Sequence, residues 1–416
     1  MKITEKDRRI LRDLAKHQYE ISQSEEMQQL RKLWTDHNDC KPSRPVLTVE
    51  LWTFADDVIP SLLRCEGEDA RQIEWRLHSN LVNHEIFRDD TVVPDYWGVG
   101  CKTWFVPYGI PVRKELSAGG GLGHHFVEVL HDLGEDFHKL KKSDFGADPE
   151  ANREQMEFYQ DLFDGCLPVK EAPIHPSACL TQHIVHIMSM ENMLFAMYDY
   201  PELFHQMMEM LTEDYLEFYR LLEEKKLLMP TVSGENLCQG TRNFTTDLPG
   251  WDVWKTRPFT TRDVWGYMDS QETSGISPEM YAEFIFPYYQ KIAAQYGLLS
   301  YGCCEAVSPI WENCISKLDN LRKVSISPWC DEEYMGEQLA GRKTIFHRKP
   351  SPNFLGVGSV LDEEGLRAHF DRTLRAAKGC ILEFSQRDVY TLHNTPQKVA
   401  RYVEILREEC DKLYQG

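Results

Sequence analysis

Short apolar runs alternate with longer helical patterns along most of this chain, and this alternation constrains the fold more than any other feature. The runs that we interpret as strands lie at 46–51, 91–96, 229–234, 264–270, 297–303, 321–327, 343–348 and 380–385, with a further candidate at 178–186. Helical patterns follow the last five runs at 278–296, 307–319, 331–341, 361–378 and 395–412. Such repetition with short connections implies parallel strands joined by right-handed crossovers. No run ends in a glycine-rich dinucleotide or phosphate loop, so the pattern favours a closed (β/α)8 TIM barrel over an open sheet.

The N-terminal segment differs from the rest of the chain. Residues 4–35 have the pattern of charged amphipathic helix, with Ile10, Leu11, Leu14 and Ile21 on one face. We therefore expect a helical extension over residues 1–44 that packs against a barrel formed by residues 45–416. A glycine-rich stretch at 119–123 precedes two histidines, not a P-loop lysine, and is predicted to be a flexible excursion.

Composition limits the classes of partner and compartment. The formal net charge of −20 and the lack of a basic stripe argue against nucleic-acid binding. No apolar run approaches the roughly 20 residues that cross a membrane, and the first residues are too charged for a secretory signal. A cytoplasmic protein is expected, in which the 12 cysteines are reduced thiols. A special cysteine would then be catalytic or metal-binding. The sequence does not indicate an oligomeric state.

One pentapeptide, Tyr301-Gly302-Cys303-Cys304-Glu305, combines thiols with a carboxylate at the end of a strand-like run. Thiolates and carboxylates together are good ligands for a divalent metal such as zinc. The alternative is a pair of buried apolar cysteines beside a solvated glutamate.

Chemistry in a barrel of this kind is found at the C-terminal ends of the strands. The candidate residues at those ends are Glu50, Trp52, Asp95, Glu235, Asp269, Gln271, Cys303, Cys304, Glu305, Trp329 and Arg348. We expect Glu50, Glu235, Cys303, Glu305 and Arg348 to converge on one cavity. Glu50 and Glu235 could instead be solvated, or could pair with Arg348.

Several motifs between about residues 170 and 410 resemble a known family. They are His186 to Leu194, Tyr200 to His205, Met268 to Gln271, Ser277 to Met280, Phe286 to Tyr289 and Tyr301 to Glu305. These motifs resemble the uroporphyrinogen decarboxylase superfamily, which includes the decarboxylases and the cobalamin-dependent (corrinoid) methyltransferases. The resemblance implies a (β/α)8 barrel.

The two branches of this family differ at the residues that define their substrates. The decarboxylases carry an N-terminal Arg-Gln-Ala-Gly-Arg segment, whereas the matching strand here is 48–53, which reads TVELWT. The methyl-transfer branch binds zinc through His-x-Cys and a later Cys. Here Tyr301 takes the histidine position, Cys303 matches one ligand, and no cysteine lies near Ser385. Cys304 and Glu305, with Cys330 or Glu235, would complete an altered zinc site.

The resemblance therefore implies a methyltransferase that moves a methyl group between a small O-methyl or N-methyl compound and a corrinoid carried by a partner protein. Cys303, Cys304 and Glu305 would hold the metal, and Glu235 or Asp269 would position or protonate the leaving group. Glu50, Trp52, Asp95, Gln271, Trp329 and Arg348 would bind the substrate. The direction of transfer stays open. Two alternatives are a lyase that anchors a non-porphyrin acid through Arg348 and Lys349, and a non-catalytic protein that docks a corrinoid partner.

Overall fold

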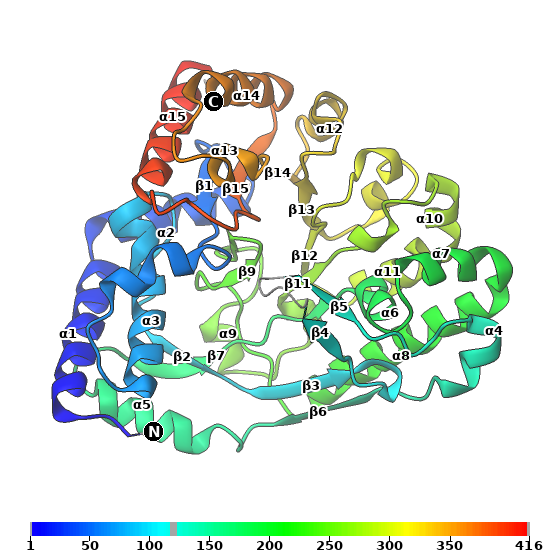
Figure 1. Cartoon of the computed structure of the whole chain (residues 1–416), viewed down its shortest axis with the longest axis horizontal. Coiled ribbons are helices and arrows are strands. Elements are labelled where there is room, and N and C mark those ends of the chain that lie inside the picture. Colours follow the sequence, from blue (N-terminus) through cyan, green and yellow to red (C-terminus); the bar gives the residue numbers. More distant parts are fainter. Residues whose placement is uncertain (1, 117–122, 414–416) are drawn as a thin grey trace.

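A curved sheet of seven parallel strands forms the centre of the protein (Figure 1), described here from a computed structural model over residues 2–116 and 123–413. The strand order is β1-β15-β14-β13-β12-β11-β8. The bounds are β1 (Val46–Val49), β8 (Ser177–Ala178), β11 (Trp265–Met268), β12 (Leu298–Tyr301), β13 (Leu321–Ile326), β14 (Ile345–Arg348) and β15 (Ile381–Gln386). The predicted α/β class and six of the predicted strands are confirmed. Residues 117–122, which include most of the predicted glycine-rich excursion, lie outside the described ranges.

The edge of β1 explains why the predicted run at 91–96 does not become a strand. The Asp89 carboxylate accepts a hydrogen bond from Val49 N at 2.7 Å, and the Asp90 carboxylate accepts one from Leu47 N at 2.9 Å. The backbone N–H of Asp90 donates to Leu47 O at 2.8 Å. Two aspartates thus occupy positions that a neighbouring strand would need. Within the described ranges, no strand pairing joins β1 to β8, so closure of the predicted barrel is not observed.

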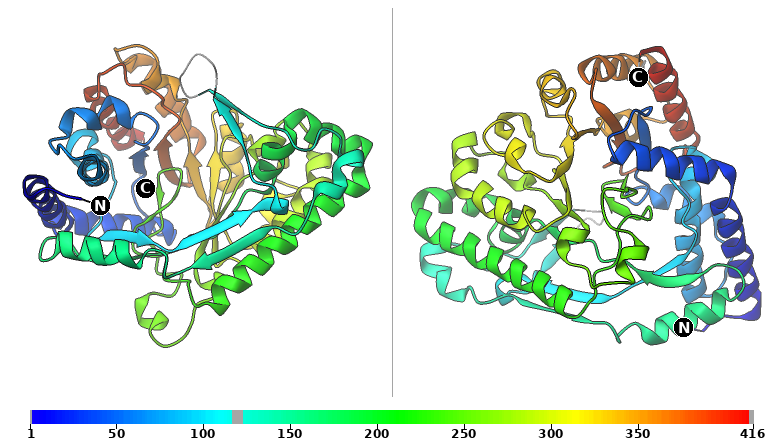
Figure 2. Two further views of the ribbon diagram at one scale, coloured as in Figure 1. Left: turned by 60° about the horizontal axis from the view of Figure 1, so that its bottom comes forward. Right: turned by 180° about the vertical axis from the view of Figure 1, so that it is seen from behind.

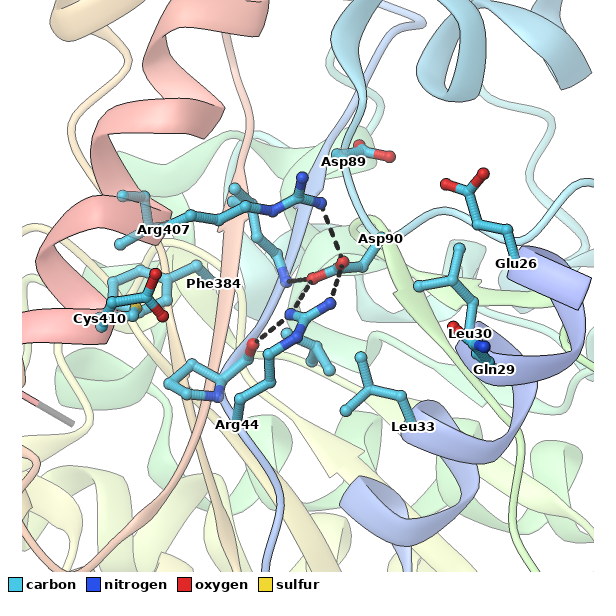
Figure 3. A pocket seen from close by; sticks show the side chains of 15 residues that line it. Glu26, Gln29, Leu30, Leu33, Arg44, Asp89, Asp90, Phe384, Arg407 and Cys410 are labelled. Atoms are coloured by element: carbon cyan, nitrogen blue, oxygen red, sulfur yellow. Dashed lines mark hydrogen bonds and ion pairs between the residues drawn. The ribbon is translucent and has the colours of Figure 1, made fainter. Parts of the chain in front are cut away.

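Asp90 also connects this edge to the C-terminal helix (Figure 3). Arg44 donates two hydrogen bonds to its carboxylate at 2.7 and 2.8 Å, and Arg407 of α15 (Gln397–Leu413) donates one at 3.1 Å. The side chain of Asp90 is fully buried, so its charge needs these partners. The first strand is in this way fixed to the last helix.

A short hairpin, β9 (Asn236–Cys238) and β10 (Thr241–Arg242), lies inside the curve of the sheet (Figure 1). Gln239 hydrogen-bonds the Tyr267 hydroxyl of β11, and Thr241 accepts a hydrogen bond from Lys323 of β13. At the tip, Gly240 has φ +83°, and a Cβ there would come within 3.0 Å of the Thr48 hydroxyl of β1. The hairpin therefore fills space enclosed by β1, β11 and β13.

The predicted run at 229–234 leads into this hairpin and does not pair as a strand. Pro230 lacks a backbone N–H, and the Thr231 hydroxyl accepts a hydrogen bond from Trp265 N at 2.9 Å. Gly234 has φ +103° and starts the turn toward β9. The segment thus crosses the N-terminal end of β11 instead of extending beside it.

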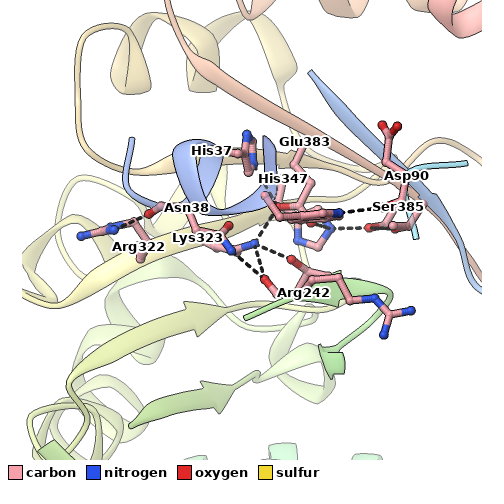
Figure 4. A network of polar contacts seen from close by, with 12 residues as sticks. His37, Asn38, Asp90, Arg242, Arg322, Lys323, His347, Glu383 and Ser385 are labelled. Carbon is pink, nitrogen blue, oxygen red and sulfur yellow. Dashed lines mark hydrogen bonds and ion pairs between the residues drawn. The ribbon is translucent and has the colours of Figure 1, made fainter. Parts of the chain in front are cut away.

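Charged residues fill the middle of the sheet's inner face (Figure 4). Lys323 Nζ lies 2.8 Å from Glu383 Oε2, and both side chains are fully buried. His37 Nε2 lies 3.3 Å from the same carboxylate oxygen, and His347 Nε2 lies 3.6 Å from Oε1. These strand residues share one face because successive side chains on a strand alternate. The inner face is therefore an ion-pair network, not an apolar layer.

Helices cover the outer face of the sheet, as the alternation predicts. Those that follow the later strands are α10 (Pro278–Phe284), α11 (Phe286–Ala293), α12 (Glu332–Leu339), α13 (Asn353–Gly356), α14 (Glu363–Ala376) and α15. The single helix predicted at 278–296 is divided in two, because Pro287 cannot donate to the preceding turn. The helix predicted at 307–319 is wrong: the structure has only 3-10 turns at Ser308–Ile310 and Ile315–Lys317. The candidate strand at 178–186 is mostly helix α6 (Leu180–Met188).

Elements between residues 68 and 254 add a second layer that runs along one side of the sheet (Figures 1 and 2). Its strands are β2 (Trp97–Gly100), β3 (Lys102–Val106), β4 (Lys114–Leu116), β5 (His124–Phe126), β6 (Asp144–Asp148) and β7 (Val169–Ala172). Its helices are α3 (Glu68–Val82), α4 (Leu133–Asp136), α5 (Arg153–Phe163), α7 (Met190–Asp199), α8 (Pro201–Glu224) and α9 (Trp251–Trp254). A π-helical turn, Asn83–Phe87, follows α3. β2 pairs with β7, β3 with β6 and β4 with β5.

The N-terminal segment is helical, as predicted, and forms α1 (Glu5–Ser22) and α2 (Glu25–Asn38). Leu11 and Leu14 are buried in a separate hydrophobic cluster with Trp34 and residues of α3, while Ile10 and Ile21 are partly buried against it. The domain boundary at residue 44 stays a prediction. Over the residues described, no helix is both long and apolar enough to span a membrane.

Candidate functional site

Thiol and charged side chains meet where the parallel strands end. Glu50 follows β1, Asp269 follows β11, Cys303 and Cys304 follow β12, Lys349 follows β14, and Arg387 and Asp388 follow β15. We call these seven residues the mouth cluster. Five of them were named from the sequence: Glu50, Asp269, Cys303 and Cys304 as candidate site residues, and Lys349 as an anchor in the lyase alternative.

Cys303 is the more acidic thiol of the cysteine pair. Its Sγ accepts a hydrogen bond from Arg387 Nη1 at 3.2 Å and lies 3.6 Å from the Cys304 Sγ. The hydrogen bond from Cys304 lowers the pKa of Cys303; burial opposes this effect, and the nearby Lys349 and Arg387 add to it. The same hydrogen bond raises the pKa of Cys304. Within the pair, loss of a proton is thus favoured at Cys303 over Cys304.

Two cations surround Cys303. Lys349 is buried, and its Nζ donates to Gly302 O at 3.4 Å. Burial lowers the pKa of Lys349, while the charge of Cys303 raises it. Arg387 lies between three acidic groups: its Nε is 3.4 Å from Glu50 Oε2, and its Nη2 is 3.1 Å from Asp388 Oδ1. Burial raises the pKa of Glu50, and Arg387 opposes that shift.

Asp269 is the carboxyl group of the cluster best suited to give a proton. Its Oδ2 accepts a hydrogen bond from the Tyr267 hydroxyl at 2.7 Å. Its Oδ1 is buried, with no hydrogen-bond partner in the part of the chain that the structure describes. Burial raises the pKa of Asp269, which favours the protonated carboxyl. One carboxyl oxygen is therefore buried and unpaired in the described structure, and a hydrogen bond from the Cys179 thiol to this carboxyl lowers the pKa of Asp269.

Glu305, predicted as a catalytic residue and metal ligand, has both carboxylate oxygens bonded to backbone N–H groups. Its Oε2 accepts a hydrogen bond from Cys303 N at 2.7 Å, and its Oε1 accepts one from Ser270 N at 3.0 Å. The carboxylate thus fastens the loop after β12 to the loop after β11. These two contacts give Glu305 a structural role, and its catalytic and metal-binding roles stay predictions.

The predicted zinc ligands are accordingly not assembled. No group of three or more His, Cys, Asp or Glu side chains suited to a metal occurs among residues 2–116 and 123–413. Cys330, a candidate further ligand, accepts a hydrogen bond from Val307 N at 3.3 Å. Arg387 and Lys349 supply the positive charge beside Cys303 that zinc would otherwise supply. The residues present do not fit the zinc site that the resemblance implies.

Glu235 and Asp95 lie apart from the mouth cluster, so the predicted convergence on one cavity is wrong for Glu235. Both residues line a cavity of about 770 Å³ that β2, β7 and the hairpin border. The Glu235 carboxylate accepts hydrogen bonds from the Tyr96 hydroxyl at 2.8 Å and from Asn243 Nδ2 at 3.0 Å. The prediction failed because residues 229–234 do not form a barrel strand that would place Glu235 at its end.

Arg348 also lies elsewhere. Its Nη1 donates to Ser327 O at 2.7 Å, and its Nε is 3.2 Å from Glu332 of α12. Alternation along β14 directs Arg348 outward and directs its neighbours, His347 and Lys349, inward. On β15, every second residue from Glu383 faces inward, so the same alternation predicts an inward side chain at Arg387. Arg387 was not among the residues predicted from the sequence.

The remaining predicted residues surround the mouth. Trp52 and Trp329 are 70% and 77% exposed, on the loops that follow β1 and β13. Gln271 begins a 3-10 turn, Gln271–Thr273, two residues after Asp269. These positions form a rim around the cluster, and a hydrogen bond from the Trp52 side chain lowers the pKa of Glu50.

Comparisons with known proteins bear on the fold alone. Neither a protein-family model nor a curated protein sequence matches this chain. A solved structure, a methyltransferase from Methanosarcina mazei, superposes with a TM-score of 0.52 at 12% sequence identity. The match covers 92% of this chain and 99% of that one. This chain is therefore similar to that methyltransferase in its whole architecture.

Proposed function

We propose that this protein is a methyltransferase that acts at the mouth cluster. The carrying observation is that an acidified thiol, a buried lysine, a partly buried arginine and a buried carboxyl with an unpaired oxygen meet at the C-terminal strand ends. The architecture shared with a protein named as a methyltransferase supports this proposal. We take the sheet to be a (β/α)8 barrel whose gap between β1 and β8 is covered by the hairpin and by the segment around Asp89.

The proposed substrate is a small compound with an O-methyl or N-methyl group. Such a group is a poor electrophile, because the atom left behind is a strong base. The protonated Asp269 can donate its proton to that atom from Oδ1, which lowers the barrier to transfer. Tyr267 fixes the other oxygen and so holds the carboxyl in one orientation.

In this proposal, Cys303 is a positioning residue that holds the Arg387 side chain in place. The Cys303 Sγ holds Arg387, and Arg387 holds Glu50, so these three residues keep one arrangement of charge around the substrate. The predicted metal role is set aside, because Glu305 faces backbone donors and the ligand set is not assembled.

The proposed acceptor or donor is a corrinoid on a partner protein. Exposed apolar side chains lie on the loops after four of the strands; they are Trp52, Trp329, Val357, Val360 and Tyr390. Such side chains around a mouth fit a protein that covers it. The corrinoid, when bound, would supply the cobalt that exchanges the methyl group with the substrate.

The test is methyl transfer with purified components. Wild-type protein, a reduced corrinoid protein and a panel of methylamines and methyl ethers are mixed, and corrinoid absorbance reports methylation. Asp269→Asn should lower kcat by roughly 10²- to 10⁴-fold, the usual contribution of a general acid. Asp319→Asn, an exposed aspartate before β13, is the matched control and should be unaffected.

Two outcomes would contradict the proposal. One is a wild-type protein that methylates no corrinoid with any substrate; the other is transfer that Asp269→Asn leaves unchanged. Stoichiometric zinc that Cys303→Ser removes would contradict the positioning role of Cys303.

A second candidate function follows from the two cations of the mouth cluster. Lys349 and Arg387 could anchor the carboxylate of a non-porphyrin acid, as in the lyase alternative, with Arg387 replacing the predicted Arg348. Release of CO2 from such an acid without any corrinoid would favour the lyase. The absence of release, together with corrinoid methylation, would favour the transferase.

A further inference from the structure

The cavity that contains Glu235 has a composition unlike that of the mouth cluster. Its volume is about 770 Å³. Five cationic side chains line it: Arg31, Arg76, Lys170, Arg242 and Lys255. The carboxylates that line it are Asp95, Glu171 and Glu235. In a chain of net charge −20, this excess of cations at one cavity is unusual.

These cations are not paired with carboxylates. Across the described ranges, none of the five takes part in an ion pair, although many other lysines and arginines do. Arg76 donates to Gly98 O at 2.6 Å and lies 3.9 Å from the centre of the Trp97 ring. Lys170 lies 5.3 Å from the centre of the Tyr96 ring. Their positive charge is therefore available to a ligand in the cavity.

Arg242 is the most exceptional member of this group. Its backbone carbonyl accepts hydrogen bonds from Asn38 at 2.8 Å and from Lys323 at 3.4 Å. Its Nε is buried and has no hydrogen-bond partner in the described structure. Figure 4 shows its guanidinium turned away from the network around Lys323 and Glu383. A desolvated guanidinium without an acceptor costs free energy, which a bound anion would recover.

Asp89 and, more weakly, Glu235 are the carboxylates that act on the charge of Arg242, and neither takes the role of that anion. The Asp89 carboxylate already accepts hydrogen bonds from Val49 N and Thr91 N. Both oxygens of Glu235 already accept hydrogen bonds, from Tyr96 and Asn243. Phe244 and the partly exposed Trp251 line the cavity as well and offer apolar surface. The site thus suits a molecule with an anionic head and an apolar, planar body.

We infer that this cavity binds a small organic anion, a carboxylate or a phosphate ester, whose head is held by Arg242. This site does not depend on the proposed methyl transfer. Arg242 and Asn236 also line a neighbouring cavity of about 330 Å³ together with Glu50 and Trp52. An occupant would therefore lie close to the mouth cluster without entering it, and Asp95 and Glu235 belong to this second site.

The test uses benzoate and phenyl phosphate as probes, with benzamide and phenol as neutral counterparts of similar shape. Calorimetric titration of the full chain should show binding of at least one anion and of neither neutral compound. Binding of benzoate would indicate a carboxylate site, and binding of phenyl phosphate would indicate a phosphate site. Arg242→Met should weaken that binding by about 10- to 100-fold, the effect of losing a charged hydrogen-bond donor. The exposed Arg262→Met is the matched control and should bind as the wild type does.

Stability gives a second readout that separates ligand binding from a structural role. Over residues 2–116 and 123–413, the Arg242 side chain makes no ion pair and its Nε has no hydrogen-bond partner, so Arg242→Met should leave the melting temperature of the ligand-free protein unchanged or raise it. The shift in melting temperature that the anion causes should disappear. If Arg242→Met does not fold, Lys170→Met tests the same loss of binding. The inference is overturned if neither anion binds, if the neutral compounds bind equally, or if Arg242→Met keeps wild-type affinity.

Discussion

Replacing Lys323 with methionine should destabilise the protein by about 3–5 kcal/mol, the usual cost of removing one partner of a buried ion pair. Lys323 and Glu383 are both fully buried, 2.8 Å apart. Without Lys323, the carboxylate would keep only His37 at 3.3 Å and His347 at 3.6 Å. Methionine has a similar length and fills the same space, so the loss would come mainly from the uncompensated charge.

Urea unfolding, followed by circular dichroism, measures this loss, and a double variant separates charge from packing. Lys323→Met combined with Glu383→Leu should recover most of the stability, because apolar replacement of a whole buried pair is often neutral or better. Glu383→Leu alone should be destabilising, since it leaves Lys323 unpaired.

The difference in unfolding free energy between the wild type and Lys323→Met should depend on pH because of Glu383. Burial alone would raise the pKa of Glu383, but Lys323, His347 and His37 hold it well below its ordinary value. A depressed carboxyl pKa stabilises the fold above the unfolded pKa of about 4.3 and loses that effect as the pH falls toward the folded pKa. The wild type should therefore exceed Lys323→Met in stability most at neutral pH and less in acid. A cost below about 1 kcal/mol, or a difference that does not change with pH, would refute the reasoning.

Three further predictions concern the mouth and the sheet edge. Lys349→Met should raise the pKa of Cys303, so the midpoint of its alkylation by iodoacetamide, followed by peptide mass spectrometry, should move to higher pH; an unmoved midpoint contradicts the assigned charges. Arg348→Met should cost about 1–3 kcal/mol in urea unfolding, because buried acceptors lose a charged donor, while methyl transfer stays unchanged. A tenfold fall in kcat would place Arg348 in the site after all. Asp90→Asn should cost a similar 1–3 kcal/mol, and unchanged stability would show that its arginines are dispensable.

The second half of the fold could be predicted because its strands are buried on both faces. Runs such as 321–327 and 380–385 stand out from the helices between them, and each became a strand of the central sheet. Because inner residues such as Lys323 and Glu383 are charged, a search for wholly hydrophobic runs would have missed parts of these strands. β-branched and aromatic neighbours on the outer face kept the pattern visible.

The first half could not be predicted in the same way, because side chains replace strand pairing there. The run at 91–96 is apolar enough for a strand, but Asp89 and Asp90 bind the edge of β1 before it begins. The run at 229–234 contains Pro230 and leads to a hairpin inside the sheet. Both choices depend on contacts between residues 34 to 43 positions apart, which periodicity does not contain.

The candidate site was predictable only as far as the strands were. Asp269 and Cys303 follow correctly placed strands and lie in the mouth cluster. Arg348 was predicted to face inward, but the inward positions are its neighbours His347 and Lys349. Glu235 was predicted at the end of a strand that residues 229–234 do not form. The predicted ligand set of Cys303, Cys304 and Glu305 stays a prediction, and sequence reasoning did not foresee that Glu305 would accept hydrogen bonds from the backbone N–H groups of Ser270 and Cys303.

The hairpin from Asn236 to Arg242 connects the mouth cluster with the second cavity. Burial raises the pKa of Cys238 to about 11 while Lys349 and Arg387 lower it, which places this thiol beside the mouth cluster. Thr241 contacts Lys323 in the ion-pair network, and Arg242 lines the second cavity. Because these residues lie within five positions, a displacement of the hairpin would change both sites together. A ligand on Arg242 is therefore expected to alter the surroundings of Cys303 through this hairpin, without any direct contact.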